Sequence, residues 1–277
     1  MNKIVVTGGT GVLGSVIVKQ LQEQGCDFTV VSRNRHKQGA YSQIVETQDY
    51  SWQRVDLSTG DGVVKALTHA DTVIHLASAP GMINNEPFEV ASIRQLLAAA
   101  QKTDINHLIY VSIVGVDRIP FSYYKAKLAS EQIVERSHVP YTILRATQFH
   151  NFIDYLLGKL FAYPVAFVPK KLKAQPISVE AVATELMKIL DAGPQHDIVN
   201  LGGRQVLDVG TMAESWQRYQ PNTKPVWNVP VVGTLMNAFA KGYNTCPEIA
   251  STSETWEEYL IRTYKMQEEH SYAAKTN

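Results

Sequence analysis

Three glycines near the start of the chain have the spacing of a loop that binds a phosphate group. Gly8, Gly11 and Gly14 follow the apolar run Ile4–Val6 and precede an amphipathic stretch. Glycine permits the tight turn and lets a pyrophosphate approach the main chain, and the amides at a helix start attract the anion. No Lys-Ser or Lys-Thr pair follows the last glycine, which excludes a nucleoside triphosphatase loop. The strand, loop and helix together predict a dinucleotide site.

The residues after the second apolar run bear on the ribose of that dinucleotide. In NAD-specific folds a carboxylate about twenty residues beyond the glycines binds the ribose 2′-hydroxyl. Here the segment carries Arg33, Arg35 and Lys37, and no carboxylate follows before Glu46. Cationic side chains suit a 2′-phosphate, so we expect NADP(H) in preference to NAD(H). A solvated basic loop is the alternative.

Further along, Asp56 has two possible roles. It ends an apolar run, where its carboxylate is placed to accept a hydrogen bond from the adenine amino group. It is equally placed to cap a helix that follows Ser58.

The elements that must position these residues alternate regularly up to about residue 145. Short apolar runs without polar alternation indicate parallel strands covered on both faces. Between them, apolar residues at spacings of three and four indicate helices. Such alternation predicts an α/β fold with a doubly wound parallel sheet, the Rossmann fold. The expected strands are Ile4–Val6, Phe28–Val31, Trp52–Val55, Thr72–Ile74, His107–Val111 and Tyr141–Leu144, and the expected helices cover 12–21, 93–100 and 128–134.

Beyond residue 145 the pattern is less regular. Helices are expected at 149–161, 179–190 and 252–263, with one more strand at 198–201 and a further helix capped by Asp208. We therefore expect a dinucleotide-binding domain over residues 1–150. A smaller, less regular substrate-binding region over 151–277 is expected to pack on it, partly interleaved, as one compact unit.

Composition limits the function classes. The chain has 277 residues, 26 basic and 26 acidic side chains and 45% hydrophobic residues. A neutral chain lacks the charge that non-specific nucleic-acid or membrane-surface binding needs, and no apolar stretch is long enough to span a bilayer. Its two cysteines match no metal spacing. With no signal-peptide pattern at the N-terminus, we expect a soluble, cytoplasmic protein that contains no metal and is a monomer or homodimer.

Several segments resemble a known superfamily. Thr7–Ser15, Ile74–Ser78 and Tyr110–Gly115 resemble the short-chain dehydrogenase/reductase superfamily. Tyr123–Glu131 and Leu144–Phe149 look like its atypical, NmrA-like branch. The resemblance covers nearly the whole chain and implies a dinucleotide cofactor, whereas it is loose for the substrate.

The resemblance implies an active-site Tyr-x-x-x-Lys pair, and Tyr123 with Lys127 has that spacing. Residues four apart share a helix face, so the ammonium is expected to lower the phenol pKa. Tyr123 would protonate a carbonyl oxygen while NADPH delivers hydride, and the family's lysine also holds the nicotinamide ribose. The family's Ser or Thr after the fifth strand is replaced by Ile113, which leaves Ser112 to orient the substrate. Without the resemblance, an ordinary helix start is the simpler interpretation of the pair.

Other positions follow from the loop and the resemblance together. Phe149, His150 and Asn151 would shape the substrate pocket beside the nicotinamide, although a plain helix start explains them as well. The residues expected to contact the cofactor are Gly8, Thr10, Gly11, Val12, Leu13, Gly14, Arg33, Asp56, Leu57, Leu76, Ala77, Ser78 and Lys127.

Two functions fit these patterns. The first is an NADPH-dependent oxidoreductase that reduces a small, apolar carbonyl, quinone or similar acceptor by hydride transfer, and the Tyr123–Lys127 pair favours it. The second is a non-catalytic, NmrA-like redox sensor that binds NAD(P) and regulates a protein partner, and Ile113 favours it.

Overall fold

The computed structural model describes residues 3–35 and 50–273. The chain divides into two compact units. The first contains residues up to 117, residues 121–146 and residues 179–200. The second contains residues 118–120, residues 147–178 and the chain from 201 onward. The chain therefore enters the second unit three times, returns to the first unit twice, and ends in the second.

A seven-stranded sheet forms the centre of the first unit, in the order β11-β8-β7-β4-β1-β2-β3. The Rossmann-like α/β fold expected from the sequence is confirmed. The central strands β1 and β4 are buried along their whole length, as their apolar runs predicted, whereas β3 and β11 at the two edges are mostly half-buried or exposed. The bounds are β1 (Ile4–Thr7), β2 (Phe28–Ser32), β3 (Ser51–Arg54), β4 (Thr72–His75), β7 (His107–Ile113), β8 (Tyr141–Ala146) and β11 (Ile198–Leu201).

The strand order reverses beside β1. From β1 the chain runs outward through β2 and β3, and it then returns to place β4 on the other side of β1. Thr7 pairs with His75 at the carboxyl ends of these two parallel strands. In open α/β sheets such a switch point is where ligands bind, because the loops that follow the two strands diverge there.

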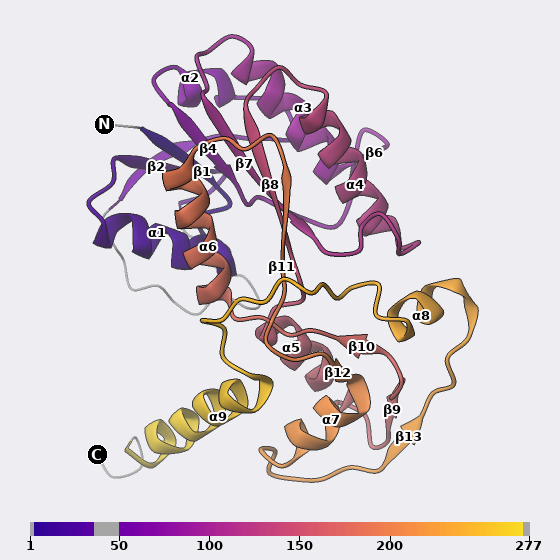
Figure 1. Ribbon diagram of the computed structural model, residues 1–277. Helices are drawn as coiled ribbons and strands as arrows, with labels where there is room; N and C mark the ends of the chain where they lie inside the picture. The colour runs from indigo at the N-terminus through magenta and orange to yellow at the C-terminus, as the bar shows by residue number, and fades with distance from the viewer. Residues whose placement is uncertain (1–2, 36–49, 274–277) are drawn as a thin grey trace. The chain divides into compact units, whose positions relative to one another are not determined.

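Helices cover both faces of this sheet (Figure 1). On one face α1 (Val12–Glu23) packs against α6 (Val179–Ala192). On the other face α3 (Phe88–Ala100) packs against α2 (Val63–Leu67) and α4 (Ser122–Glu135). A short hairpin of β5 (Met82–Ile83) and β6 (Glu86–Pro87) precedes α3.

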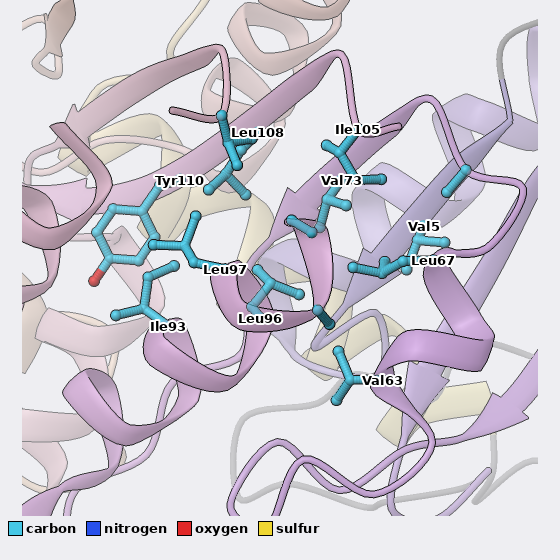
Figure 2. Close-up of a cluster of buried hydrophobic side chains, with 14 of the residues drawn as sticks. Val5, Val63, Leu67, Val73, Ile93, Leu96, Leu97, Ile105, Leu108 and Tyr110 are labelled. Atoms are coloured by element: carbon cyan, nitrogen blue, oxygen red, sulfur yellow. The ribbon is translucent and has the colours of Figure 1, made fainter. Parts of the chain in front are cut away.

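The core between the sheet and helices α2 and α3 is built mainly from aliphatic residues, together with the aromatic ring of Tyr110 (Figure 2). Burying one such side chain contributes about 2 kcal/mol. The strands contribute Val5, Val73, Leu108 and Tyr110, and the helices contribute Val63, Leu67, Ile93, Leu96 and Leu97.

The second unit has shorter elements. Its helices are α5 (His150–Leu160), α7 (Val209–Gln217), α8 (Gly233–Ala240) and α9 (Trp256–Ala273). Its strands form two small sheets: β9 (Ala166–Val168) pairs with β13 (Val226–Asn228), and β10 (Lys173–Ala174) pairs with β12 (Leu207–Asp208). Asp208 precedes α7 as expected, but its side chain makes no capping hydrogen bond.

One carboxylate ties three aromatic side chains together in the core of the second unit. Asp154, on α5, accepts hydrogen bonds from Trp216 Nε1 at 2.6 Å, Tyr264 Oη at 2.7 Å and Tyr259 Oη at 2.8 Å. Because these donors come from α7 and α9, the carboxylate joins the three helices at one point.

Candidate functional site

The glycine loop between β1 and α1 has no room for side chains at two of its three glycines. Gly8 has a φ of 69°, and a Cβ there would lie 2.6 Å from the backbone nitrogen of Ala77. A Cβ on Gly14 would collide with the carbonyl oxygen of Gly8. The amide of Gly11 donates to that same oxygen at 2.9 Å. The loop is therefore a tight backbone turn at the switch point.

This turn leads directly into the start of α1. Gly11 is the N-cap, and it has no side chain to satisfy the first amides of the helix. Val12 and Leu13 are the first two helical residues, and Leu13 is buried. The first amides of a helix left unpaired next to a glycine turn are the donor set that a pyrophosphate requires. The loop thus fits a dinucleotide.

Thr7, the last residue of β1, fixes the segment that follows β4. Its Oγ1 accepts hydrogen bonds from the amides of Leu76 and Ala77, each at 3.2 Å, and contacts His75 Nδ1 at 2.9 Å. His75 is 1% exposed and stacks on Tyr110, and burial lowers its pKa to about 3. Thr7 therefore sets the path of the segment from Leu76 to Ser78 beside the glycine loop.

The residues expected near the adenosine half lie after β2 and β3. Arg33 and Arg35 are exposed, and Lys37 falls outside the described residues. Leu57 is buried. Asp56 Oδ1 accepts the amide of Ser58 at 2.9 Å and its hydroxyl at 2.5 Å.

Hydrogen bonding to Ser58 is the main cause that lowers the pKa of Asp56, and the charge of Arg33 acts in the same direction. The helix cap, one of the two possible roles of Asp56, is not formed, because the N-cap of α2 is Gly62 and no side chain bonds there.

Tyr123 belongs to a chain of polar contacts that connects three elements. Its hydroxyl lies 2.5 Å from Ser78 Oγ, in the segment after β4. Ser78 Oγ donates to Glu89 Oε1, on α3, at 2.6 Å. The other carboxylate oxygen of Glu89 lies 2.9 Å from Lys127 Nζ, on α4. Tyr123 is half-buried and Ser78 is exposed, so the phenol end of the chain is the accessible one.

The ion pair at the other end is buried. The side chains of Lys127 and Glu89 are 6% and 1% exposed. Lys127 Nζ also donates to the carbonyl of Val111 at 3.1 Å and lies 4.9 Å from the ring centre of Tyr110. Its pKa is raised although burial acts against its charge, because Tyr110 and Glu89 stabilise the ammonium. Lys127 therefore stays charged, and the carboxylate of Glu89 compensates its charge.

The pKa of Tyr123 differs from what its spacing to Lys127 predicts. Burial raises the pKa of Tyr123 and Glu89 adds to the increase, while Lys127 and the hydrogen bond with Ser78 act in the opposite direction. The spacing alone places the Lys127 ammonium near the Tyr123 phenol, but it does not reveal that the carboxylate of Glu89 compensates the charge of that ammonium. The phenol is held in its neutral form.

Ser112, on β7, is 2% exposed, and its hydroxyl has no hydrogen-bond partner among the described residues. Direct contact with a substrate would require this side chain to become accessible.

We did not expect Glu89 in this arrangement. The sequence contained one signal: Glu89 lies on the same helix face as Ile93, Leu96 and Ala100, which are buried. A carboxylate on a buried stripe requires a cationic or hydrogen-bonding partner.

The three expected substrate residues lie in the second unit, at the start of α5. Phe149 is the N-cap, and Asn151 is half-buried. His150 is 2% exposed and stacks on Tyr259 at 5.1 Å and Trp256 at 6.1 Å between ring centres. Burial lowers the pKa of His150 to about 3. The environment of His150 is that of a packed core residue.

Two negative findings apply to the described part of the chain. Within residues 3–35 and 50–273, no group of three or more His, Cys, Asp or Glu side chains is arranged to hold a metal ion. Over the same residues, no helix has the length and apolar character needed to cross a membrane.

A glycine turn at the switch point of a parallel sheet, opening onto an uncapped helix, defines a Rossmann-type dinucleotide-binding protein. Residues 8–192 match the family described as NAD(P)H-binding, and the chain belongs to that family.

The relatives are distant. The chain is 24% identical over 224 residues to the 40 kDa subunit of mitochondrial NADH-ubiquinone oxidoreductase from Neurospora crassa. That match covers 79% of this chain, and the chain spans 56% of the length of that relative.

Two solved structures share the fold. An NADPH-dependent quinone oxidoreductase from Escherichia coli, complexed with NADPH, superposes with a TM-score of 0.75 at 16% identity over 94% of this chain and 99% of its own. A nucleoside-diphosphate-sugar epimerase from Staphylococcus aureus superposes with a TM-score of 0.73 at 18% identity, over 94% of this chain and 99% of its own.

Proposed function

We propose that this protein is an oxidoreductase of the NmrA-like branch that uses NADPH to reduce a small, apolar carbonyl, quinone or similar acceptor. The observation that carries the proposal is the half-buried phenol of Tyr123. It lies within hydrogen-bonding distance of Ser78, in the segment that Thr7 fixes beside the glycine loop. The names of the relatives from Neurospora crassa and Escherichia coli support redox chemistry.

In this proposal the dinucleotide is held by backbone groups of the first unit. The glycine loop and the first amides of α1 bind the pyrophosphate, with Leu76, Ala77 and Ser78 lining the adjacent wall. Arg33 supplies the positive charge for the 2′-phosphate. Asp56 already accepts two hydrogen bonds from Ser58, so it helps to shape the adenine site. When bound, NADPH supplies the hydride.

In this proposal, side chains of the first unit supply the proton that reduction of the acceptor requires. Tyr123 Oη donates its proton to the acceptor oxygen as negative charge develops there. Lys127 contributes a fixed positive charge, partly compensated by Glu89, and binds the ribose only if its buried ammonium becomes accessible. Ser112 lies on β7 beside this group and orients the substrate only if its buried hydroxyl becomes accessible.

The test is NADPH oxidation with a panel of quinones, aldehydes and ketones, comparing wild type with Tyr123→Phe. We expect kcat to fall by about 100-fold or more, because general acid catalysis contributes about 10²–10⁴-fold. Calorimetric titration should show unchanged NADPH binding by both proteins and weaker binding of NADH. The matched control is Tyr163→Phe, which removes the same hydroxyl from a side chain that is 69% exposed. Unchanged turnover in Tyr123→Phe would refute the role of Tyr123.

A second function is favoured by the environment of β7. Ile113 cannot donate a hydrogen bond, and the hydroxyl of Ser112 is buried, so the acceptor oxygen lacks an accessible donor on this strand. This favours a redox sensor that binds the dinucleotide without turnover. NADPH binding by the wild type with no oxidation on any acceptor would establish this alternative.

A further inference from the structure

The direction of the hydrogen bonds around Ser78 follows from the chemistry of Glu89. A carboxylate only accepts hydrogen bonds, and a serine hydroxyl has one proton to donate. Ser78 Oγ donates its one hydrogen bond to Glu89 Oε1, which also accepts a hydrogen bond from the amide of Ala79 at 3.2 Å. In the absence of an acceptor, the short contact between Ser78 and Tyr123 is then a bond that Tyr123 donates. The O–H of Tyr123 turns from Ser78 to the acceptor oxygen when it donates its proton there.

From this geometry we infer that Ser78 and Glu89 are positioning residues for Tyr123: Glu89 opposes the charge of Lys127 and so keeps the phenol in its protonated form, and Ser78 fixes the place of its hydroxyl. The pair makes the site an acid, suited to reduction of an acceptor, and opposes the phenolate that alcohol oxidation would need. The inference rests on the proposed function for the role of Tyr123. It also assigns a role to Glu89, a residue that is not part of the Tyr-x-x-x-Lys pattern.

The charges around the phenol agree with this assignment. Glu89 comes from α3, Lys127 from α4, Tyr110 from β7 and His75 from β4. His75 is neutral because burial lowers its pKa, and Tyr110 is neutral because burial raises its pKa to about 12. The ammonium of Lys127 and the carboxylate of Glu89 are therefore the only charges among these four groups, and they oppose each other.

The consequence is a specific pH dependence. Reduction needs the phenol protonated, so its rate falls only as the pH rises through the phenol pKa. Removing the negative charge of Glu89 leaves Lys127 uncompensated, and the nearby ammonium then favours the phenolate. The variant Glu89→Gln keeps an amide oxygen that can accept the Ser78 proton, so it changes the charge while retaining that hydrogen bond.

We expect the alkaline limb of the kcat profile to move down by about one pH unit in Glu89→Gln. The matched control is Glu86→Gln, three residues earlier, which removes the same charge from a side chain paired with Arg94 at the surface. Its alkaline limb should coincide with that of the wild type. A limb that stays in place in Glu89→Gln would overturn the inference.

A second readout does not depend on turnover. Carbon-13 NMR of Cζ-labelled tyrosine, compared with Tyr123→Phe to assign the resonance, gives the phenol pKa directly. The inference expects a lower value in Glu89→Gln than in wild type, and equal values would refute it. If no acceptor is reduced at all, the proposed function fails while this titration still decides the role of Glu89.

Glu89 is buried, so Glu89→Gln carries a risk of misfolding, and Ser78 provides an exposed alternative. Ser78→Ala should lower kcat by about 10-fold, and Ser78→Thr should restore it, because threonine keeps the hydroxyl. Wild-type kcat in Ser78→Ala, or no recovery in Ser78→Thr, would show that the hydroxyl does not position Tyr123.

Discussion

Gly14 and Gly158 both lie inside helices, but their surroundings differ. A Cβ on Gly14 would collide with the Gly8 carbonyl oxygen, whereas one on Gly158 would meet nothing within 4 Å. Gly14 is therefore required by the close approach of α1 to the loop. Gly158 is replaceable, and as a helical glycine it lowers stability relative to alanine.

Substituting alanine at these two sites should have opposite effects. Gly14→Ala forces the loop backbone to move, so we expect a loss of about 1–3 kcal/mol in the free energy of unfolding and much weaker NADPH binding. Gly158→Ala should gain about 0.5–1 kcal/mol and bind NADPH as the wild type does. Urea unfolding and calorimetric titration measure both quantities. Equal behaviour of the two variants would contradict the steric explanation.

The individual site residues differ in how far the sequence predicts them. The glycines are predictable because the turn and the helix start are local features. The contacts of Tyr123 are not, because Ser78 and Glu89 lie 45 and 34 residues away in the chain. Only the fold of β4, α3 and α4 brings them together, and with them comes the charge that opposes Lys127.

Among the elements, length determines what is predictable. The strands of the central sheet have apolar runs long enough to recognise, and the structure forms a strand at each of them. β9, β10, β12 and β13 have only two or three residues each, too few for a hydrophobic period to be visible. The short strands of the second unit were therefore not predictable.

The junction of α5, α7 and α9 should depend on one carboxylate. Asp154→Ala leaves three aromatic donors without their acceptor, and we expect a loss of about 3 kcal/mol in the free energy of unfolding. The matched control is Asp208→Ala, at a cap position where the side chain makes no hydrogen bond. It should cost less than about 0.5 kcal/mol. Urea unfolding of both variants tests this, and similar losses would contradict the role of Asp154.

For the whole molecule, buried neutral histidines should make stability depend on pH. The pKa values of His75 and His150 are lowered from 6.5 to about 3, and these residues lie one in each unit. Below pH 6.5 the unfolded chain binds protons that the folded chain excludes. Stability is therefore full above pH 6.5 and falls as the pH decreases towards 3, by about 2 kcal/mol for each residue at pH 5.

Replacing one of them should flatten this dependence. His150→Phe keeps a ring stacked against Trp256 and Tyr259 and removes the titrating group, so the loss of stability between pH 7 and pH 5 should be smaller than in the wild type. His138→Gln, at an exposed position, should leave the slope unchanged. Urea unfolding at the two pH values measures the slopes. The same slope in His150→Phe and wild type would refute this explanation.

The aromatic core around Asp154 also gives the protein an intrinsic optical probe. The chain has four tryptophans, and three of them, Trp216, Trp227 and Trp256, belong to the second unit. Trp216 and Trp256 are buried, and each donates its indole proton inside that core. Tryptophan fluorescence therefore reports mainly on the second unit, so opening of that unit is visible even while the dinucleotide-binding sheet stays folded.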